Sequence, residues 1–431
     1  MKTIQNQLMP YKSRSKLALH RTLSTLKWAI LSLIEGAILG VLGTAFYYCV
    51  TFVTGLRQSH IEITYLLPVG SLLILYVYHL TKRDTPGGTN LVLSSIREDK
   101  DVPLRMTPLI FFSTVFSHLC GASVGREGAA LQLGGSIGAN MAKFFHQRGG
   151  DRKIMIITGM GAAFSALLGT PLTGAVFALE ITSVGVMYYP ALLPSVIAAL
   201  TAHQVALLLH QPVVHYSIGE IPDFGFLTGL QIGVVGIASG AAAILFILSL
   251  RLVEKESGHC LHNKYIRGLI LGTILLGLTL LTNVLEGTPQ QYNGAGIDMI
   301  NLAIRGNSPW YAFLVKILFT ALSIAAGYKG GEIVPSFFIG ATLGCAIAPL
   351  IGLSPALCAA AGMGAVFCGV TNCPMAGLLF LFELFGFEAM PYFLLAIAIS
   401  YVVSSYVTLY KTQHFHFAKF KGDDPLQHGG R

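Results

Sequence analysis

Apolar blocks of about twenty residues, almost free of charge, recur along this chain; three examples are Trp28 to Val53, Leu227 to Leu250 and Pro391 to Leu409. A helix of ~20 apolar residues crosses the core of a bilayer, whereas a membrane barrel needs ~10-residue segments of alternating polarity. Only 11% of the residues are charged, less than half of the roughly 25% usual in soluble domains. The sequence therefore predicts an all-α polytopic membrane protein.

Basic residues gather at the N-terminus. Lysine and arginine occur six times in the first 27 residues, and no acid precedes Glu35. Such charge keeps the end of a chain in the cytoplasm, so we expect residues 1–23 to be a cytoplasmic segment at a plasma membrane, here the bacterial inner membrane. The other basic residues form no single stripe, which argues against a nucleic-acid partner. The first apolar run is too long for a cleaved signal peptide.

An internal repeat divides the chain into two related halves. An offset of 203 residues aligns Gly159 to Glu180 with Gly362 to Glu383 without a gap, and nine of the 22 positions are identical. Duplicated halves with broken hydrophobic segments are typical of transporters that bind substrate between the repeats. We expect membrane repeats at 24–215 and 222–412, and a short tail at 413–431 without a regulatory domain.

Three glycine-rich breaks interrupt apolar sequence and precede predicted helices. Non-helical backbone at membrane depth must be buried in protein or line a cavity, and a helix that starts there directs free N–H groups and a positive dipole end at an anion. The residues at these breaks that we expect to bind an anion are Gly87, Gly88, Thr89 and Asn90 in the first, Gly125, Arg126 and Gly128 in the second, and Gly331, Ile333 and Val334 in the third.

Two carboxylates at the breaks are the candidates for gating and proton coupling. An ionisable group at membrane depth indicates function. The carboxylate of Glu127 would compete with an anion for the same amides, and its protonation would link anion movement to proton movement. A salt bridge with Arg126 is the structural alternative for Glu127, although Arg126 has Glu62 and Glu332 as other possible partners. For Glu332 the structural alternative is a pair with Lys329 or Lys316.

Other polar residues have structural interpretations. Glu180 and Glu383 end the repeated helices symmetrically, which favours capping or hydrogen bonding between helices. His118, His203 and His210 are expected in the core or at interfaces. Neither the tail histidines (His414, His416 and His428) nor the seven cysteines have the spacing of metal ligands, so we expect packing thiols and no metal or cofactor.

These motifs resemble the CLC family of chloride channels and anion/proton antiporters over nearly the whole chain. The resemblance is carried by GREG at 125–128, GGxxxP at 330–335 and the duplicated GMGA segments. It implies a homodimer of inverted-repeat subunits with broken, re-entrant helices, each with its own anion pathway. It also implies that Glu127 is the gating glutamate, that the amides of Ile333 and Val334 bind the central anion, and that Tyr410 is the central tyrosine.

Three departures from the chloride members make the chain similar to the fluoride/proton antiporter branch. Gly88 stands where chloride members carry an anion-binding serine, although Thr89 is a possible substitute. Glu332 replaces an apolar residue, and Ile181 stands at the position of the internal proton glutamate. Fluoride members often carry threonine where this chain has Ala129 and Val334.

Fluoride suits such a site because it is a strongly hydrated ion that needs close hydrogen-bond donors, and protonated glutamates can donate. We therefore expect a fluoride/proton antiporter that confers fluoride resistance, not an enzyme. A chloride/proton antiporter and a passive anion channel of the same fold are alternatives. A remote one is an intramembrane serine protease, since residues 134–138 fit GxSxG and His203 or His210 follows. The same residues also form GxxxG, a helix-packing motif.

Overall fold

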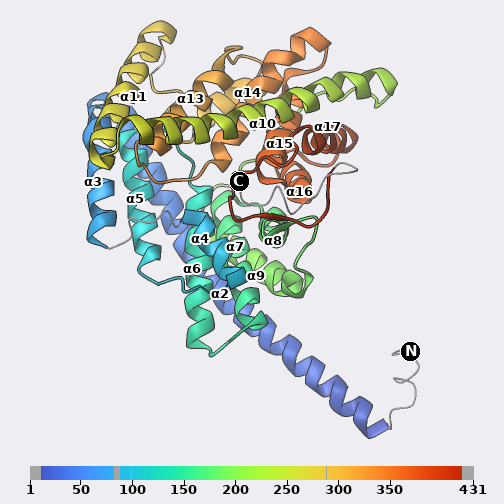
Figure 1. Ribbon diagram of the computed structural model, residues 1–431. Coiled ribbons are helices and arrows are strands. Elements are labelled where there is room, and N and C mark those ends of the chain that lie inside the picture. Colours follow the sequence, from blue (N-terminus) through green and yellow to red (C-terminus); the bar gives the residue numbers. More distant parts are fainter. Residues whose placement is uncertain (1–10, 82–87, 99, 288, 420–431) are drawn as a thin grey trace.

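The computed structural model of the protein describes residues 11–81, 88–98, 100–287 and 289–419, and the side chains of these from residue 16 onward. The described chain is a bundle of helices with two short strands (Figure 1). In that view the helices of the second half lie along the upper part of the molecule, and most of those of the first half lie below and to the left. The predicted all-α polytopic fold is confirmed.

The elements of the first half follow one another with short connections. They are α2 (Tyr11–Ser59), η1 (Ile61–Leu66), α3 (Leu67–Leu80), α4 (Gly88–Glu98), α5 (Met106–Cys120), α6 (Glu127–Phe144), α7 (Gly150–Leu168), α8 (Pro171–Glu180), β1 (Ser183–Val184), η2 (Tyr189–Ala191) and α9 (Leu192–Leu208).

A long helix opens the second half and crosses the molecule. The elements are α10 (Phe226–Cys260), α11 (Lys264–Glu286), α12 (Ile297–Ile304), α13 (Ala312–Ala325), α14 (Ile333–Ile351), α15 (Pro355–Thr371), α16 (Pro374–Phe385), α17 (Met390–Val403) and β2 (His414–Phe415).

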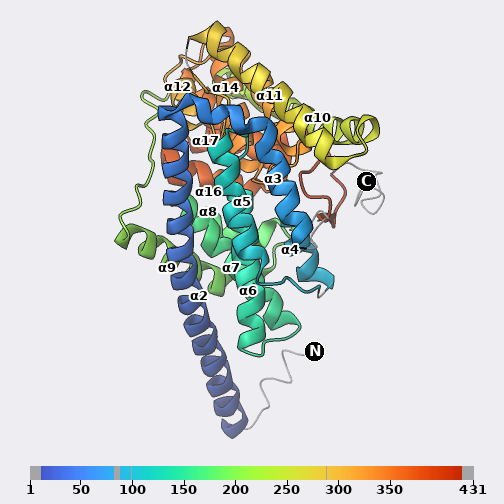
Figure 2. The ribbon, with the colours of Figure 1, turned by 90° about the vertical axis from the view of Figure 1, so that its left-hand side faces the viewer.

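Six helical segments in the described chain are long and apolar enough to cross a membrane, and several apolar helices are shorter. The longest, α2, projects from the body at its N-terminal end (Figure 2). The predicted span from Pro391 to Leu409 was wrong at its end, because α17 stops at Val403. Ser405 adopts a positive φ of 53°, and the chain then leaves the helix axis. This turn brings Tyr410 into the interior, where it is 3% exposed.

Glycines bring two pairs of helices into backbone contact at related positions. A Cβ on Gly134 of α6 would lie 2.1 Å from the carbonyl oxygen of Gly159 on α7, and a Cβ on Gly340 of α14 would lie 2.2 Å from that of Gly362 on α15. Only glycine permits this approach. The GxxxG motif of α6 therefore packs helices. The hydroxyl of Ser136, within it, donates to the carbonyl of Pro103 and accepts from Thr107.

The two symmetric glutamates each cap the equivalent helix of the other half. Glu180, at the end of α8, accepts hydrogen bonds from the backbone N–H groups of Met375 and Ala376 at the start of α16, at 3.2 and 2.9 Å. Glu383, on α16, accepts from those of Leu172 and Thr173 at the start of α8, at 2.7 and 2.9 Å. A carboxylate there satisfies free donors and complements the helix dipole. The expected capping is present.

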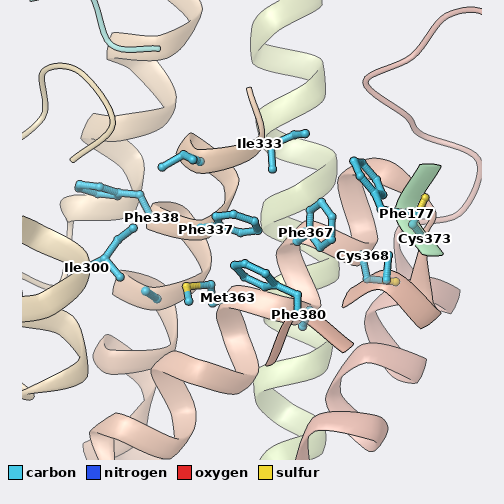
Figure 3. Packing of buried hydrophobic residues seen from close by; sticks show 14 of the residues in the cluster. Phe177, Ile300, Ile333, Phe337, Phe338, Met363, Phe367, Cys368, Cys373 and Phe380 are labelled. Carbon is cyan, nitrogen blue, oxygen red and sulfur yellow. The ribbon is translucent and has the colours of Figure 1, made fainter. Parts of the chain in front are cut away.

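Aromatic rings from both halves pack together in the core (Figure 3). Phe337 of α14 stacks on Phe380 of α16 with ring centroids 4.2 Å apart. Phe367 of α15 contacts both rings and also Phe177 of α8. Offset and edge-to-face contacts of this kind stabilise aromatic clusters beyond the area they bury. The cluster holds the start of α14 firmly against α15 and α16.

Candidate functional site

Two of the predicted breaks meet backbone to backbone at the centre of the molecule. The N–H of Gly125 donates to the carbonyl of Gly331 at 2.6 Å, and the N–H of Gly331 donates to the carbonyl of Gly125 at 2.8 Å. This bridge joins residues that are 206 positions apart (331 minus 125). Because α6 begins at Glu127 and α14 at Ile333, the bridge sets the two helix starts side by side.

The bridge leaves no room for side chains. A Cβ on Gly128 would lie 2.8 Å from the Cα of Gly331, and a Cβ on Gly331 would lie 2.5 Å from the amide nitrogen of Gly128. A Cβ on Gly125 would lie 2.9 Å from the Oε2 atom of Glu127. Real Cβ atoms do not tolerate such distances from backbone atoms, so glycine is required at Gly128 and Gly331 for the backbone groups to approach each other, whereas a Cβ on Gly125 would displace the Glu127 carboxylate.

Neither helix start is capped by the side chain of its own N-cap residue. The N-cap residues are Arg126 for α6 and Glu332 for α14, and neither side chain bonds to the first turn. Ile333 and Val334, in the first turn of α14, are 0% and 2% exposed. Amides at an uncapped, buried helix start are donors for an anion.

Glu127 folds back over the start of its own helix. The side chain is 1% exposed, and its Oε2 atom accepts a hydrogen bond from the backbone N–H of Arg126 at 2.9 Å. Its Oε1 atom has no hydrogen-bond partner in the described part of the chain. The carboxylate thus accepts from a backbone donor of the kind that an anion would use, and its second oxygen makes no hydrogen bond in the described part of the chain.

Arg126 pairs with Glu127, not with Glu62 or Glu332 as the sequence also allowed. Its Nε atom lies 3.5 Å from the Oε1 atom of Glu127. Its guanidinium lies over the ring of Tyr47, 4.6 Å from the centroid. The salt bridge given above as the structural alternative for Glu127 is therefore present, because the Glu127 side chain turns back toward the N-terminus of α6.

The start of α4 lies against the first turn of α6. The Thr89 hydroxyl donates to the carbonyl of Gly128 at 3.3 Å, and Gln132 of α6 donates to the Thr89 hydroxyl at 3.4 Å. Gly88 has a positive φ of 45°, and a Cβ there would lie 3.9 Å from the amide nitrogen of Gln132. Gly87 lies outside the described residues.

The segment after α17 reaches the same region. Asn90 accepts hydrogen bonds from the backbone N–H and the hydroxyl of Thr412, at 3.4 and 3.2 Å. Tyr410 precedes Thr412 by two residues. Its side chain is buried and lies close enough to Glu332 for an electrostatic interaction. Parallel pairing of β2 with β1 fixes the path of this segment. The structure therefore brings the described parts of the three breaks and Tyr410 to one place.

The two lysines considered for Glu332 behave differently. Lys316 donates instead to the carbonyls of Tyr292 and Gly294, at 3.0 and 2.8 Å. Lys329 lies within electrostatic range of Glu332, and its ammonium is 4.9 Å from the ring centroid of Tyr78. The alternative of a pair between Glu332 and Lys316 was therefore wrong. Lys329 is the lysine that interacts electrostatically with Glu332.

Sequence reasoning missed two glutamines. Gln132 is 5% exposed and faces Gly88 and Thr89. Gln413 is 2% exposed and donates to the carbonyls of Thr371 and Ile181, at 2.9 and 3.3 Å, so it lies beside the backbone of Ile181. The sequence feature that could have indicated Gln132 is its position about one and a half turns after Glu127 on the same helix. No neighbouring sequence feature indicates Gln413.

The chain is similar to known proteins over most of its length. A family model described as voltage gated chloride channel matches residues 69–405. The chloride/fluoride channel protein of Pseudomonas syringae pv. tomato is 35% identical over 401 residues, which cover 91% of this chain and 87% of that protein.

Two further proteins are similar over most of their lengths. The H(+)/Cl(-) exchange transporter ClcA of Yersinia pseudotuberculosis is 25% identical, with 82% of this chain and 79% of that protein covered. The crystal structure of a CLC-type fluoride/proton antiporter superposes with a TM-score of 0.84 at 30% identity, covering 89% of this chain and 97% of the other.

Proposed function

Because the chain belongs to the CLC family of voltage-gated chloride channels and anion/proton antiporters, we propose that it is a fluoride/proton antiporter that exports fluoride against inward proton flow. One observation carries the proposal. A buried carboxylate, Glu127, accepts a backbone N–H at an otherwise uncapped helix start. A group in that position excludes an anion when ionised and admits one when it is protonated or displaced.

Gating follows from this competition. While ionised, the Glu127 carboxylate holds the Arg126 amide and is itself held by the Arg126 side chain. Protonation removes the charge and weakens both interactions, so the side chain leaves and an anion takes the amides. When the anion moves on, Glu127 returns and releases its proton. Each cycle thereby links anion movement to proton movement in the opposite direction.

The central anion site is formed by backbone donors at the start of α14. The amides of Ile333 and Val334, together with Tyr410, Asn90 and Thr89, surround the ion from three segments of the chain. Helix amides bind without a full positive charge, which keeps binding reversible, as transport requires. Gly88, Gly125, Gly128 and Gly331 let the backbone approach the ion.

Three features favour fluoride over chloride. Gly88 supplies no hydroxyl, Glu332 adds a carboxyl that donates to fluoride when it is protonated, and Gln132 adds a carboxamide donor near Thr89. A small, strongly hydrated ion requires such close donors in exchange for its water. A relative named as a chloride/fluoride channel protein and a solved fluoride/proton antiporter of the same fold support this choice.

A chloride/proton antiporter or a passive anion channel is the second candidate. The observation that favours a passive channel is Ile181, which is 0% exposed and supplies no internal proton acceptor. In that case anions would flow without a proton signal, although Glu127 would still open and close the path.

The same proposal includes the setting of the protein. The basic segment 1–23 lies in the cytoplasm of a bacterium, at the inner membrane. The two membrane repeats comprise residues 24–215 and 222–412. Residues 413–431 form a tail. Two chains form a homodimer in the bilayer, and the cell gains fluoride resistance. The protein carries ions and catalyses no covalent chemistry.

The test is ion efflux from proteoliposomes loaded with fluoride or with chloride, with the external pH recorded at the same time. We expect fluoride release coupled to proton uptake, and slower chloride release. Glu127→Gln should abolish proton movement, because the amide side chain carries no exchangeable proton, and any fluoride flux that remains in this variant should be uncoupled from protons. In the wild type, chloride flux as fast as fluoride flux, or anion flux without a proton signal, would contradict fluoride antiport.

Asp101→Asn is the matched control. Asp101 lies in the loop after α4, and the hydrogen bond from Lys143 lowers the pKa of its carboxyl below the usual value. A carboxyl with a lowered pKa stays ionised above the ordinary value of about 3.9. This substitution therefore removes no proton-binding group in the working range, and the pH profile of transport should stay as in the wild type.

A further inference from the structure

Two buried cations lie beside the break that precedes α6. Arg57, near the end of α2, is 1% exposed, and Lys316, on α13, is 0% exposed. The two charges lie within electrostatic range of each other, and His118 of α5 lies within range of both. Burying one charge is costly, and two of the same sign raise that cost.

The partners of these cations are neutral or missing. Lys316 donates to two backbone carbonyls, those of Tyr292 and Gly294, and its ammonium lies 5.0 Å from the ring centroid of Phe338. For Arg57, the buried Nε and Nη1 atoms have no hydrogen-bond partner in the described chain, and neither has the Nε2 atom of His118. Orphaned buried donors indicate an ion or a water that completes the site.

Nearby carboxylates are engaged elsewhere. Asp298 accepts a hydrogen bond from Gln58, next to Arg57 in sequence, at 3.3 Å. Glu286 accepts from the hydroxyls of Tyr292 and Tyr311. Among the described residues, no ion pair includes Arg57 or Lys316. A bound water would supply hydrogen bonds but no charge, so an anion satisfies the cluster better.

The backbone closes tightly around the guanidinium. A Cβ on Gly121 would lie 3.1 Å from the Nη1 atom of Arg57, and a Cβ on Gly294 would lie 3.5 Å from its Nη2 atom and 3.4 Å from the Nδ1 atom of His118. Both glycines have positive φ angles, 93° and 57°. Arg57 and His118 thus meet at Gly294, whose carbonyl also holds Lys316.

This cluster is joined directly to the proposed gate. Asn293 donates to the carbonyl of Gly121, and the N–H of Gly294 donates to that of Ala122. Ser123 bonds to Thr320 and Ser323, which follow Lys316 by one and two turns on α13. Four residues after Ser123 comes Glu127, and His118 interacts with the backbone of Gly125.

The cluster lies on the far side of the gate from the basic N-terminus. Arg57 is close to the end of α2, at the opposite end of this helix from its N-terminal projection (Figure 2). The start of α12 lies beside it, as the hydrogen bond between Gln58 and Asp298 requires. With the N-terminus in the cytoplasm, this is the external half of the protein.

We propose that Arg57, Lys316 and His118 form a second anion-binding site, external to the Glu127 gate, that takes a small inorganic anion such as the transported ion. The inference rests on the proposed anion transport and adds a place where the ion is held after it passes the gate. Arg57 supplies the free donors, Lys316 supplies further positive charge, and His118 connects the site to Gly125.

Equilibrium binding of fluoride to the purified full chain, measured by titration calorimetry, tests the site. Compared with the wild type, Arg57→Gln should weaken binding by about tenfold or remove one of two binding events, and Arg57→Lys should retain part of the affinity. Arg305→Gln, which changes an exposed arginine after α12, should bind as the wild type does. Unchanged binding in folded Arg57→Gln protein would overturn the proposal and leave Arg57 a structural cation.

Two further measurements keep the outcomes distinct. Should Arg57→Gln give no folded protein by gel filtration, Lys316→Gln and His118→Gln address the same site, and unchanged binding in both would refute it. Wild-type exchange in proteoliposomes separates the two proposals. Loss of binding in the variants together with no fluoride/proton exchange by the wild type rejects the antiporter and keeps the site, whereas normal exchange with unchanged binding rejects the site alone.

Discussion

Under our proposal, single side chains decide which ion the candidate site holds. Gly88 supplies no hydroxyl, and the carboxamide nitrogen of Gln132 lies 3.9 Å from the position that a Cβ on Gly88 would take. Glu332 places a carboxyl next to the α14 amides, within range of Lys329. Gln132 is 5% exposed and Glu332 is partly buried, so the interactions that these two side chains make are weakly screened by water.

Gln132→Leu should weaken fluoride transport without unfolding the protein. Removing one donor to a charged partner costs about 1.5–3 kcal/mol, which corresponds to a rise of roughly ten- to a hundredfold in the fluoride concentration at half-maximal rate. Initial rates of efflux at several fluoride concentrations measure this. Gln147→Leu, at a partly buried glutamine that accepts a hydrogen bond from Lys27, is the control, and equal kinetics in the two variants would show that Gln132 does not face the ion.

Glu332→Gln should change selectivity more than it changes total flux. The amide keeps a donor at the site but removes the exchangeable proton, so we expect slower fluoride exchange and a smaller ratio of fluoride flux to chloride flux. Parallel efflux measurements with the two ions give that ratio. An unaltered ratio would assign Glu332 a purely structural role beside Lys329.

At the scale of elements, the site depends on helices that start inside the protein and on what fixes those starts. The backbone bridge between Gly125 and Gly331 sets the starts of α6 and α14 together. The crossed caps of Glu180 and Glu383 fix the starts of α16 and α8. Since α8 and α16 pack on the helices that hold the aromatic cluster, the caps stabilise the positions of the helices around the site.

Glu383→Ala should destabilise the fold by about 1–3 kcal/mol, because it leaves the N–H groups of Leu172 and Thr173 at the start of α8 without their carboxylate acceptor. Glu180→Ala should act in the same direction on α16. Thermal unfolding in detergent measures the loss, and Glu388→Ala, at an exposed glutamate, serves as the control. Stability equal to the control in both variants would mean that water replaces the caps.

For the whole molecule, the sidedness of the membrane orders all the parts. A helix as long as α2 (49 residues) spans the bilayer and exceeds it, since about 20 residues suffice. Its two ends must therefore lie on opposite sides, the basic end in the cytoplasm under our proposal. The gate then lies between a cytoplasmic approach and the external Arg57 cluster.

Labelling of single cysteines in intact cells checks this sidedness. In a background without native cysteines, Glu62→Cys should react with a membrane-impermeant maleimide, and His20→Cys should react only after the cells are opened. Both positions are exposed. Labelling of His20→Cys alone would invert the topology and place the Arg57 cluster on the cytoplasmic side.

The sequence by itself determined the properties that depend on local composition and on self-similarity. Long apolar runs specify membrane helices, the offset of 203 residues between Gly159 and Gly362 reveals the halves, and glycine runs mark Glu127 and Ile333 as helix starts. These follow from spacing along the chain, which the sequence displays directly.

Only the tertiary structure decided which distant groups meet. It paired Gly125 with Gly331, turned Glu127 back onto Arg126, directed Lys316 to the carbonyls of Tyr292 and Gly294 instead of Glu332, and brought Arg57 to His118. Local spacing carries no information about such contacts, because the packing of many apolar side chains fixes them together. The buried charges are then held wherever that packing leaves them.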